Sequence, residues 1–505
     1  MDVIWIIFYT LLIAFIPFYF VFLKRNAYWA DRGVLHEKPV LFYGNMRNVG
    51  RTQPLRQPFR ELYAKYKDKV PFCGFYISLR PAVVLFDLEL IKNVLIRDFS
   101  KFANRGNYYN EKADPLSAHL FNLDGPKWRD MRVKLTPTFT TGKMKFMFPT
   151  VVDVANRFVT VLDGIVKSET SELRSCNIEV KELLARFTTD VIGCCAFGLE
   201  CNSLQDPNME FRLMSKKVFN SRRHGRFVGA LIRSFPKIAR MCGAKLVHED
   251  VSKFFMRVVR ENVEYRESEG IQRNDFMNLL IELKNTKDQN ALTLEEIAAQ
   301  AFVFFIAGFE TSSSTMGFCL YELALNPSVQ NKARDEIEEM FKRHGGQLTY
   351  DGLKELKYLQ NVLHETMRMY SIASIIMRQT VENYAVPNTN HVIEKDIIVI
   401  IPIDAIHYDP AIYPNPTKFD PGRFEPEEVE KRHTMSFLPF GDGPRNCIGM
   451  RFGEMQAMIG LVMLLKNFQF SPCEHTKIPI EISTKSVVLS SQHGISLEVK
   501  KLLEN

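Results

Sequence analysis

The sequence lacks the features that would place it in several common classes of protein. Its nine cysteines are an odd number with no CxxC pair and no zinc-type spacing, which disfavours a disulfide framework or a structural zinc site. No GxGxxG motif follows a candidate strand, so the chain has no apparent flavin-binding or nucleotide-binding segment of its own. A net charge of +7 without a long basic block argues against nucleic acid as a partner.

Internal repeats, low-complexity tracts and a second linker are also missing, which favours one large domain over several small ones. With 505 residues, of which 46% are hydrophobic and 12% aromatic, the chain can bury an extensive core. Residues 3–23 form a nearly unbroken apolar run that is long enough to cross a bilayer as a helix. We therefore predict a membrane anchor over 1–23, a linker over 24–39 and a catalytic domain over 40–505.

The charges around the apolar run predict its orientation. Only Asp2 is charged before it, whereas Lys24, Arg25 and Arg32 follow it, so the positive-inside rule places the catalytic domain on the cytoplasmic side. The favoured location is the endoplasmic reticulum membrane. A cleaved signal peptide and a mitochondrial presequence remain alternatives, although the first arginine is at position 25.

Most of the chain has helical periodicity, and only four apolar runs indicate strands. The predicted strands lie within 70–79, 82–86, 397–403 and 486–499. The clearest helix begins at Thr293, which can form a capping box with Glu296, and continues to Leu325 before an Asn-Pro pair. Its centre is apolar all round but too short to span a bilayer, so we expect a long helix that crosses the domain interior.

The most informative stretch is FGDGPRNCIG at 440–449. Its cysteine, Cys447, can supply a thiolate ligand to haem iron, and helix-forming residues follow it from position 448 to 465. A helix N-terminus beside the sulfur would favour its anionic form. Phe440 can shield the sulfur from water, Arg445 can pair with a haem propionate, and Gly449 would permit close approach of a flat macrocycle. The alternative is a buried, inert cysteine.

The pattern Phe-x-x-Gly-x-Arg-x-Cys-x-Gly resembles the signature of the cytochrome P-450 family. The resemblance implies a mainly α fold with a minor β subdomain, a long central helix over the haem and a single N-terminal transmembrane helix. It also implies haem b, with Cys447 as the axial metal ligand. The stretches at 114–118, 139–143 and 146–149 are similar to the insect microsomal family 6 branch.

Within the long helix, residues 307–312 read AGFETS, which resembles the motif of the same family that bends this helix above the haem. The resemblance implies that Glu310 and Thr311 are catalytic and deliver protons during oxygen activation. It places Ala307 against the cofactor. The structural alternative is that these hydroxyls only bond back to carbonyls one turn earlier and bend the helix.

Two further matches follow the order of the family motifs. Glu365 and Arg368 have the spacing of its ExxR helix, and Arg423 that of its PxRF loop, which implies a buried charge network that stabilises the haem-binding core. Ser371 and Gly422 depart from the usual residues near these motifs, and 35–39 is poorer in proline than the usual hinge. A WxxxR element implies that four side chains bind the propionates together with Arg445: Trp128, Arg132, Arg378 and Arg105. An ordinary amphipathic helix is the alternative for 128–132.

The substrate pocket is assigned from positions in the family. Its candidates are mostly apolar, which implies a lipophilic small-molecule substrate, although each could be an ordinary core residue. They are Leu120, Phe121, Val303, Ile306, Ala307, Ala373, Ser374, Ile376 and Ser490, with Phe211, Met214 and Ile372 as further members and the rest of 489–492 beside Ser490.

The resemblance implies a monooxygenase that uses O2 and electrons from NADPH-cytochrome P-450 reductase, with cytochrome b5 as an optional second donor. A basic docking face for the reductase is predicted at Lys127, Arg129, Lys134, Lys143, Lys145 and Arg451, a solvated charged surface being the alternative. Xenobiotics such as insecticides or plant toxins, and endogenous hormones or lipids, are the expected substrates. The competing functions are a haem-thiolate isomerase or dehydratase and a non-enzymatic membrane haem protein.

Overall fold

The structure is a computed structural model of the whole chain, and it describes residues 5, 9, 16, 19, 20, 23–169, 175–273, 275–286 and 291–503. The predicted anchor over residues 1–23 therefore lies largely outside the described residues. One described helix is long and apolar enough to cross a membrane, Leu294–Leu325, but two thirds of its most apolar window is buried inside the protein. It is a core helix, as its all-round apolar sequence predicts.

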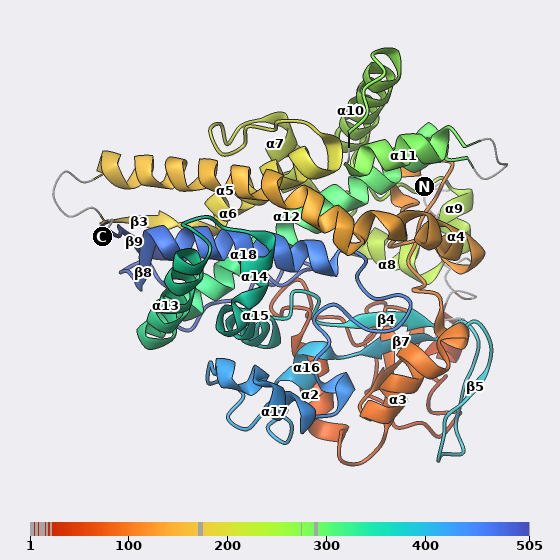
Figure 1. Cartoon of the computed structure of the whole chain (residues 1–505). Helices are drawn as coiled ribbons and strands as arrows, with labels where there is room; N and C mark the ends of the chain where they lie inside the picture. Colours follow the sequence, from red (N-terminus) through yellow and green to blue (C-terminus); the bar gives the residue numbers. More distant parts are fainter. Residues whose placement is uncertain are drawn as a thin grey trace.

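Helices make up most of the fold, with strands gathered at one end (Figure 1). The α-helices are α2 Gln57–Tyr66, α3 Leu88–Lys92, α4 Gly125–Leu135, α5 Thr141–Glu169, α6 Val180–Ile192, α7 Glu210–Asn220, α8 Arg226–Ser234, α9 Pro236–Met241, α10 Glu249–Ser268, α11 Phe276–Lys284, α12 Leu294–Leu325, α13 Pro327–Arg343, α14 Tyr350–Glu355, α15 Lys357–Met369, α16 Ile403–His407, α17 Pro426–Glu430 and α18 Met450–Asn467. The expected mainly α fold with a minor β part is confirmed.

The strands form three small sheets. They are β1 Phe72–Ile77, β2 Arg80–Leu85, β3 Ser175–Glu179, β4 Ile376–Gln379, β5 Tyr384–Ala385, β6 Val392–Ile393, β7 Ile398–Ile401, β8 Phe468–Pro472 and β9 Ser496–Lys501. The largest sheet has the order β1-β2-β7-β4, with β2 and β7 parallel and the other pairs antiparallel. The second has the order β3-β9-β8, and β5 pairs with β6.

The strand predictions are correct in part. Strands occur within 70–79, 82–86 and 397–403, but only the last few residues of 486–499 belong to one, because β9 starts at Ser496. The preceding residues form a looped segment, in which Ile482 and Ser491 make an isolated bridge and Leu489 donates to the Ile372 carbonyl. These residues bond to one another across the loop and to a distant loop, and they do not extend β9.

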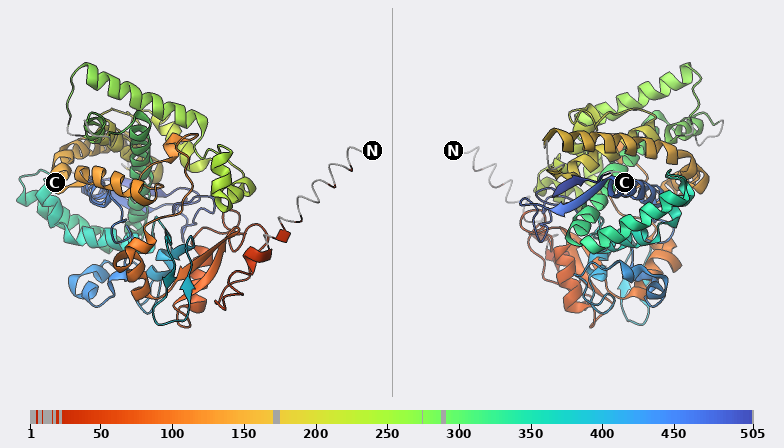
Figure 2. Two further views of the ribbon diagram at one scale, coloured as in Figure 1. Left: turned by 90° about the vertical axis from the view of Figure 1, so that its right-hand side faces the viewer. Right: turned by 60° about the vertical axis from the view of Figure 1, so that its left-hand side comes forward.

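Helix α12 is the centre of the fold. Thr293 and Glu296 form the predicted capping box, and the helix ends before Pro327, whose ring lacks the N–H needed to continue it. Its 32 residues span about 48 Å. It packs against α6, α10, α15 and α18, and Figure 2 shows it from two sides, inside the helical part of the molecule.

Two hydrophobic cores share the structure, one among the helices and one around the four-stranded sheet. The sheet core includes Trp29, which is only 1% exposed and donates from Nε1 to the Phe75 carbonyl at 3.1 Å. A Cβ built on Gly74 would lie 2.5 Å from the Trp29 ring, so the strand must have glycine there. The packing of the domain therefore begins within 24–39, before the predicted boundary at residue 40.

Candidate active site

Cys447 lies in the loop that precedes α18, and local hydrogen bonds give the loop its shape. The Cys447 N–H donates to the Phe440 carbonyl at 2.9 Å, and the Asn446 N–H donates to the Gly443 carbonyl at 3.1 Å. Gly443 has a φ of 73°, and a Cβ on it would lie 1.9 Å from the Leu95 carbonyl oxygen. Only glycine fits this turn.

Helix α18 begins two residues later than predicted, at Met450, with Gly449 as its N-cap. Burial raises the pKa of the Cys447 thiol, whereas a backbone N–H of Gly449 and the positive charges of Arg105 and Arg132 lower it. The thiol nevertheless keeps accessible surface. Arg445, which is 2% exposed, and the charges of Arg105 and Arg132 adjoin the sulfur, so we infer that this surface borders a space inside the molecule.

Helix α12 contributes the facing wall. Ala307 is exposed, although Phe305 and Phe309 on either side of it are almost completely buried. Thr311 lies one turn further on the same side, and Val303 one turn before it. Val303, Ala307 and Thr311 therefore form one stripe along α12, of which Ala307 is exposed and Val303 is buried.

The hydroxyl of Thr311 donates to the Ala307 carbonyl at 2.6 Å, and Thr315 donates in the same way to the Thr311 carbonyl at 2.9 Å. These are the back-bonds of the structural alternative, which bend helices. The structural role of Thr311 is compatible with the catalytic one, because a hydroxyl that donates one hydrogen bond can still accept another at its oxygen.

Glu310 points to a different neighbour from Thr311, since successive helical residues are about 100° apart. Its Oε1 accepts from Lys181 Nζ of α6 at 3.0 Å and from the Ser314 hydroxyl at 3.3 Å. Lys181 also donates to Ser313 Oγ at 3.2 Å. Both charged side chains are 14% exposed. Lys181 was not predicted, because it is 129 residues distant in sequence and carries no local motif.

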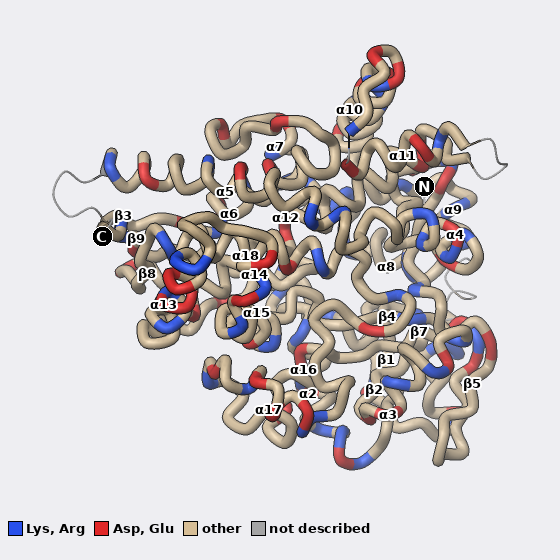
Figure 3. The backbone as a smooth tube through the Cα atoms, in the orientation of Figure 1, with Lys and Arg blue, Asp and Glu red and all other residues tan. Residues whose placement is uncertain are grey.

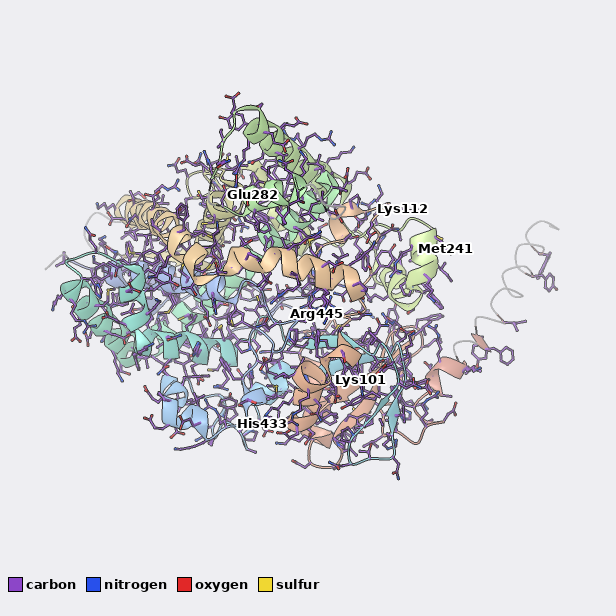
Figure 4. All side chains as sticks on the ribbon, turned by 45° about the vertical axis from the view of Figure 1, so that its right-hand side comes forward. Lys101, Lys112, Met241, Glu282, His433 and Arg445 are labelled. Carbon is purple, nitrogen blue, oxygen red and sulfur yellow. The ribbon has the colours of Figure 1, made fainter. Side chains whose placement is uncertain are left out.

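Arginine side chains gather beside the cysteine loop. Arg445 is 2% exposed, bonds to the carbonyls of Ala103 and Leu123, lies 3.3 Å from Asp124 Oδ1 and has its guanidinium over the Trp128 ring. Figure 4 shows it in the interior, between the helices and the sheet.

The other predicted propionate ligands reach the same region. Arg105 Nη2 donates to the Arg445 carbonyl at 3.3 Å, and its guanidinium lies over the Phe121 ring. The Arg132 guanidinium donates to two oxygens of Asn446, the backbone carbonyl at 3.1 Å and the side-chain Oδ1 at 2.9 Å. Arg378 is 1% exposed and donates only to the Met377 carbonyl among the bonds of the described residues.

Buried positive charge accumulates in this cluster. Burial lowers the pKa of Arg378 to about 9 and that of Arg445 to about 10. It also lowers the pKa of Arg105 and Arg132, and Arg105 is further lowered by the charges of Arg445 and Arg378. The Nε atoms of Arg378 and Arg445 are buried without a hydrogen-bond partner. Carboxylate groups of a ligand would satisfy both the charges and the unpaired donors.

A model of the family "Cytochrome P450" matches residues 35–499. The chain belongs to the cytochrome P450 family. Cytochrome P450 6a8 of Drosophila melanogaster is 50% identical over 487 residues, covering 94% of this chain and 95% of that protein. Cytochrome P450 6a2 of the same fly is 48% identical, covering 96% and 97%, and Cytochrome P450 6A1 of Musca domestica is 45% identical, covering 95% of each.

Membership in the P450 family makes the chain a haem-dependent monooxygenase that uses O2 and electrons from a redox partner. The family binds haem through a cysteine thiolate, which supplies electron density that favours O–O cleavage. In this chain Cys447 would hold the iron. The donor set fits this cofactor, because the accessible sulfur of Cys447 adjoins four arginines that the two propionates would neutralise. Arg378 and Arg445 are buried, and Arg105 and Arg132 are half-buried. Gly449 adds no obstacle, since a Cβ there would only touch Phe139 at 3.8 Å.

The pocket candidates come together from separate segments. The Leu120 N–H donates to Gln300 Oε1 of α12 at 2.9 Å, and the Leu489 N–H donates to the Ile372 carbonyl. Ile376 lies against the cysteine loop, 3.3 Å from a Cβ built on Gly441. The bond between Leu120 and Gln300 was not predicted, since an isolated glutamine carries no sequence signal. Other candidates vary in exposure: Ala373 and Phe121 are exposed, Ile306 and Ser490 are half-buried, and Ser374 and Val303 are buried.

The predicted charge network is present. Arg368 donates to both oxygens of Glu365 at 2.7 and 2.8 Å, and neither side chain is exposed. Arg423 Nε lies 3.3 Å from Glu365 Oε1, and the Asp420 N–H donates to the same oxygen at 3.0 Å. Burial raises the pKa of Glu365, and these partners oppose that rise.

Ser371, one of the departures from the family pattern, links this network to the cysteine loop. Its hydroxyl lies 2.8 Å from His407 Nδ1, and His407 Nε2 accepts from the Leu438 N–H at 3.0 Å. Burial lowers the pKa of His407 to about 3, so the ring is neutral. Since Nε2 accepts, Nδ1 carries the proton and donates to Ser371. Arg368 binds the His407 carbonyl at 2.8 Å.

We expect His407→Phe to destabilise the protein more than Ser371→Ala does. The first change leaves the buried Leu438 N–H unpaired, at a cost of about 1–3 kcal/mol, whereas the second removes one bond with a net value of about 1 kcal/mol. Chemical denaturation of the haem-loaded protein measures the free energy of unfolding of each variant. Equal effects of the two variants would show that His407 does not support the loop through Leu438.

Proposed function

We propose that the protein is a microsomal monooxygenase of the endoplasmic reticulum, with its catalytic domain on the cytoplasmic side. It would oxidise lipophilic small molecules with electrons from NADPH-cytochrome P450 reductase, and cytochrome b5 would serve as an optional second donor. The observation that carries the proposal is the apolar face of α12 opposite the Cys447 loop. Ala307 is accessible there and Val303 and Ile306 adjoin it, so the space beside the thiol suits an apolar molecule.

Two features support attachment to a membrane. The apolar run over 3–23 has the length of a transmembrane helix. On the folded domain, α8 and α9 expose four large apolar side chains, namely Phe227, Val228, Ile238 and Met241. The end of the N-terminal helix lies beside them, where Arg25 donates to the Ser234 carbonyl at 3.4 Å. A chain anchored at its N-terminus would therefore hold this apolar surface against lipid.

The chemistry of the pocket supports a broad class of lipophilic substrates. The nine pocket candidates include no charged side chain and only two hydroxyls, Ser374 and Ser490. Such a pocket recognises substrates by shape and apolar contact. Xenobiotics such as insecticides and plant toxins fit this class, and so do endogenous hormones and lipids. Product profiling with reductase and a panel of these compounds tests the proposal, and turnover of only charged, polar compounds would contradict it.

The predicted basic docking face is partly neutralised in the structure. Lys127 pairs with Glu111 at 2.6 Å, and Lys145 lies 3.9 Å from Asp351. Among the residues that the structure describes, no ion pair joins Arg129 or Lys143 to a carboxylate, and Arg451 bonds only to the Thr141 hydroxyl, at 3.4 Å. These three residues, which lie on α4, at the start of α5 and at the start of α18, are the better candidates for contact with an acidic flavin domain.

Thr311→Ala should retain haem but lose most substrate oxidation. The Thr311 hydroxyl lies beside Ala307 on the accessible side of α12. There it can hold a proton donor in the space between α12 and the Cys447 loop. Loss of positioned proton transfer typically slows turnover by about 10²- to 10⁴-fold. Product formed per NADPH consumed is the measurement, and Thr315→Ala is the matched control, since Thr315 makes the same back-bond one turn away. Equal coupling in the two variants would assign Thr311 a structural role only.

A further inference from the structure

Four arginines from two distant parts of the chain meet at α8. Arg226 donates to the Arg47 carbonyl at 2.6 Å, and Arg222 donates to the Lys485 carbonyl at 3.0 Å. Burial and the charges of Arg222 and Arg226 lower the pKa of Arg233. We call Arg47, Arg222, Arg226 and Arg233 the arginine cluster. Lys485 adds a fifth basic residue at its edge.

The cluster has no acidic counterpart. Among the described residues, no ion pair joins any of its four guanidinium groups to a carboxylate, and the guanidinium groups of Arg222 and Arg226 donate to backbone carbonyls. Nearby arginines differ, because Arg223 lies 3.8 Å from Glu249 and Arg257 lies 2.8 Å from Glu210. Like charges held together destabilise a surface unless an anion joins them. Guanidinium groups bind phosphate in a fork geometry.

The position of the cluster indicates which anion it meets. Besides its bond to Ser234, Arg25 at the end of the N-terminal helix places its guanidinium 4.9 Å from the centre of the Phe235 ring, so α8 lies where the chain enters its apolar N-terminal run. Basic residues gather around α8 and α9 in Figure 3. In Figure 4, Met241, which is 87% exposed, points outward on the same side as the N-terminal residues.

Basic and apolar groups alternate on this surface. Phe227 and Val228 are exposed between Arg226 and Arg233, and the Phe227 ring packs edge-on against Phe42 at 5.8 Å. A surface with apolar side chains and unpaired cations is typical of segments that lie in the interfacial layer of an anionic membrane. An acidic protein would engage the charges but would leave the apolar side chains without a lipid phase to enter.

We propose that the arginine cluster binds the phosphate-bearing headgroups of anionic phospholipids and thereby sets how deeply α8 and α9 enter the membrane. The inference rests on the proposed membrane location and adds a lipid class to it. Each basic residue near an anionic surface strengthens association by about fivefold. The attraction extends only over a Debye length, so high salt weakens it.

The test uses the full-length, haem-loaded protein in lipid nanodiscs. A fluorophore on Cys242, an exposed thiol that follows Met241, reports depth through quenching by lipids that carry a spin label at the headgroup. Nanodiscs of phosphatidylcholine alone are compared with nanodiscs that also contain phosphatidylserine. We expect stronger quenching with phosphatidylserine, and a loss of this gain in Arg222→Gln/Arg233→Gln, which replaces two exposed members of the cluster.

The matched control is Lys332→Gln/Lys342→Gln on the exposed surface of α13, which removes the same charge far from α8 and should keep the full gain. Quenching that is equal in the two lipids for the wild type would overturn the lipid proposal while leaving the membrane location intact. Absence of quenching in both lipids would instead contradict the membrane location. An unchanged gain in the arginine variant, or slower reduction by the reductase in phosphatidylcholine alone, would assign the cluster to another partner and overturn the proposal.

Discussion

Cys447→Ala is expected to abolish substrate oxidation and to remove the red-shifted Soret band of the reduced carbonyl complex. The described residues offer no other sulfur on the cysteine loop, and Arg105 and Arg132 provide positive charge that stabilises a thiolate at this position. Without the thiolate, the iron loses the axial ligand that favours O–O cleavage. Absorption spectra of the dithionite-reduced, carbon monoxide-treated protein give the measurement.

The control is Cys242→Ala, which removes another exposed thiol at the end of α9, away from the loop. Its spectrum and turnover should match those of the wild type. A thiolate-type band that persists in Cys447→Ala would show that a different residue ligates the iron. The account of the cysteine loop would then be wrong.

Arg368→Met should be the most destabilising single change in the protein. It leaves the fully buried Glu365 carboxylate without its two closest hydrogen bonds, and breaking a buried ion pair in this way costs about 3–5 kcal/mol. The same substitution removes donors from the His407 and Pro416 carbonyls. We expect a large drop in the yield of folded, haem-loaded protein and in the denaturation midpoint.

Arg343→Met is the matched control, because Arg343 also pairs with glutamates, at 3.1 Å, but its side chain is 50% exposed. Exposed pairs contribute only about 0–1 kcal/mol. The double variant Glu365→Gln/Arg368→Met should recover part of the lost stability, since it removes the uncompensated charge. A midpoint for Arg368→Met that equals the Arg343→Met value would exclude a stabilising role for the network.

The parts of this fold that follow from sequence are those with local causes. The start of α12 depends on the capping box of Thr293 and Glu296, and its end depends on the proline that follows. The ion pair of Glu365 with Arg368 depends on their spacing of three residues in a helix. The turn before Cys447 follows from Gly443, which no other residue could replace.

The parts that sequence could not supply depend on contacts between distant segments. Lys181 reaches Glu310 only because α6 packs along α12, and His407 at the end of α16 joins Ser371 to Leu438 on two other segments. The apolar run before β9 looked like a strand, but it makes only an isolated bridge and a bond to the loop at Ile372. The arginine cluster likewise forms from residues about 180 positions apart in the chain.

The relation of Glu310 to proton delivery also changes with the structure. The family resemblance treats Glu310 and Thr311 as one unit, yet their side chains leave α12 in different directions. Glu310 is held by Lys181 and Ser314, and Thr311 faces the accessible stripe with Ala307. A proton that passes between them would need an intermediate carrier, and the Ser314 hydroxyl, which bonds to Glu310, is a candidate.

The most direct test of the central claim is the source of the oxygen atom in the product. The full-length protein is supplied with NADPH, the diflavin reductase, an accepted lipophilic substrate and isotopically labelled dioxygen, and the product is weighed by mass spectrometry. We predict one labelled oxygen atom per product molecule and no product when NADPH or reductase is omitted. Product that forms without them, or that carries oxygen only from water, would contradict the account of this protein as a monooxygenase.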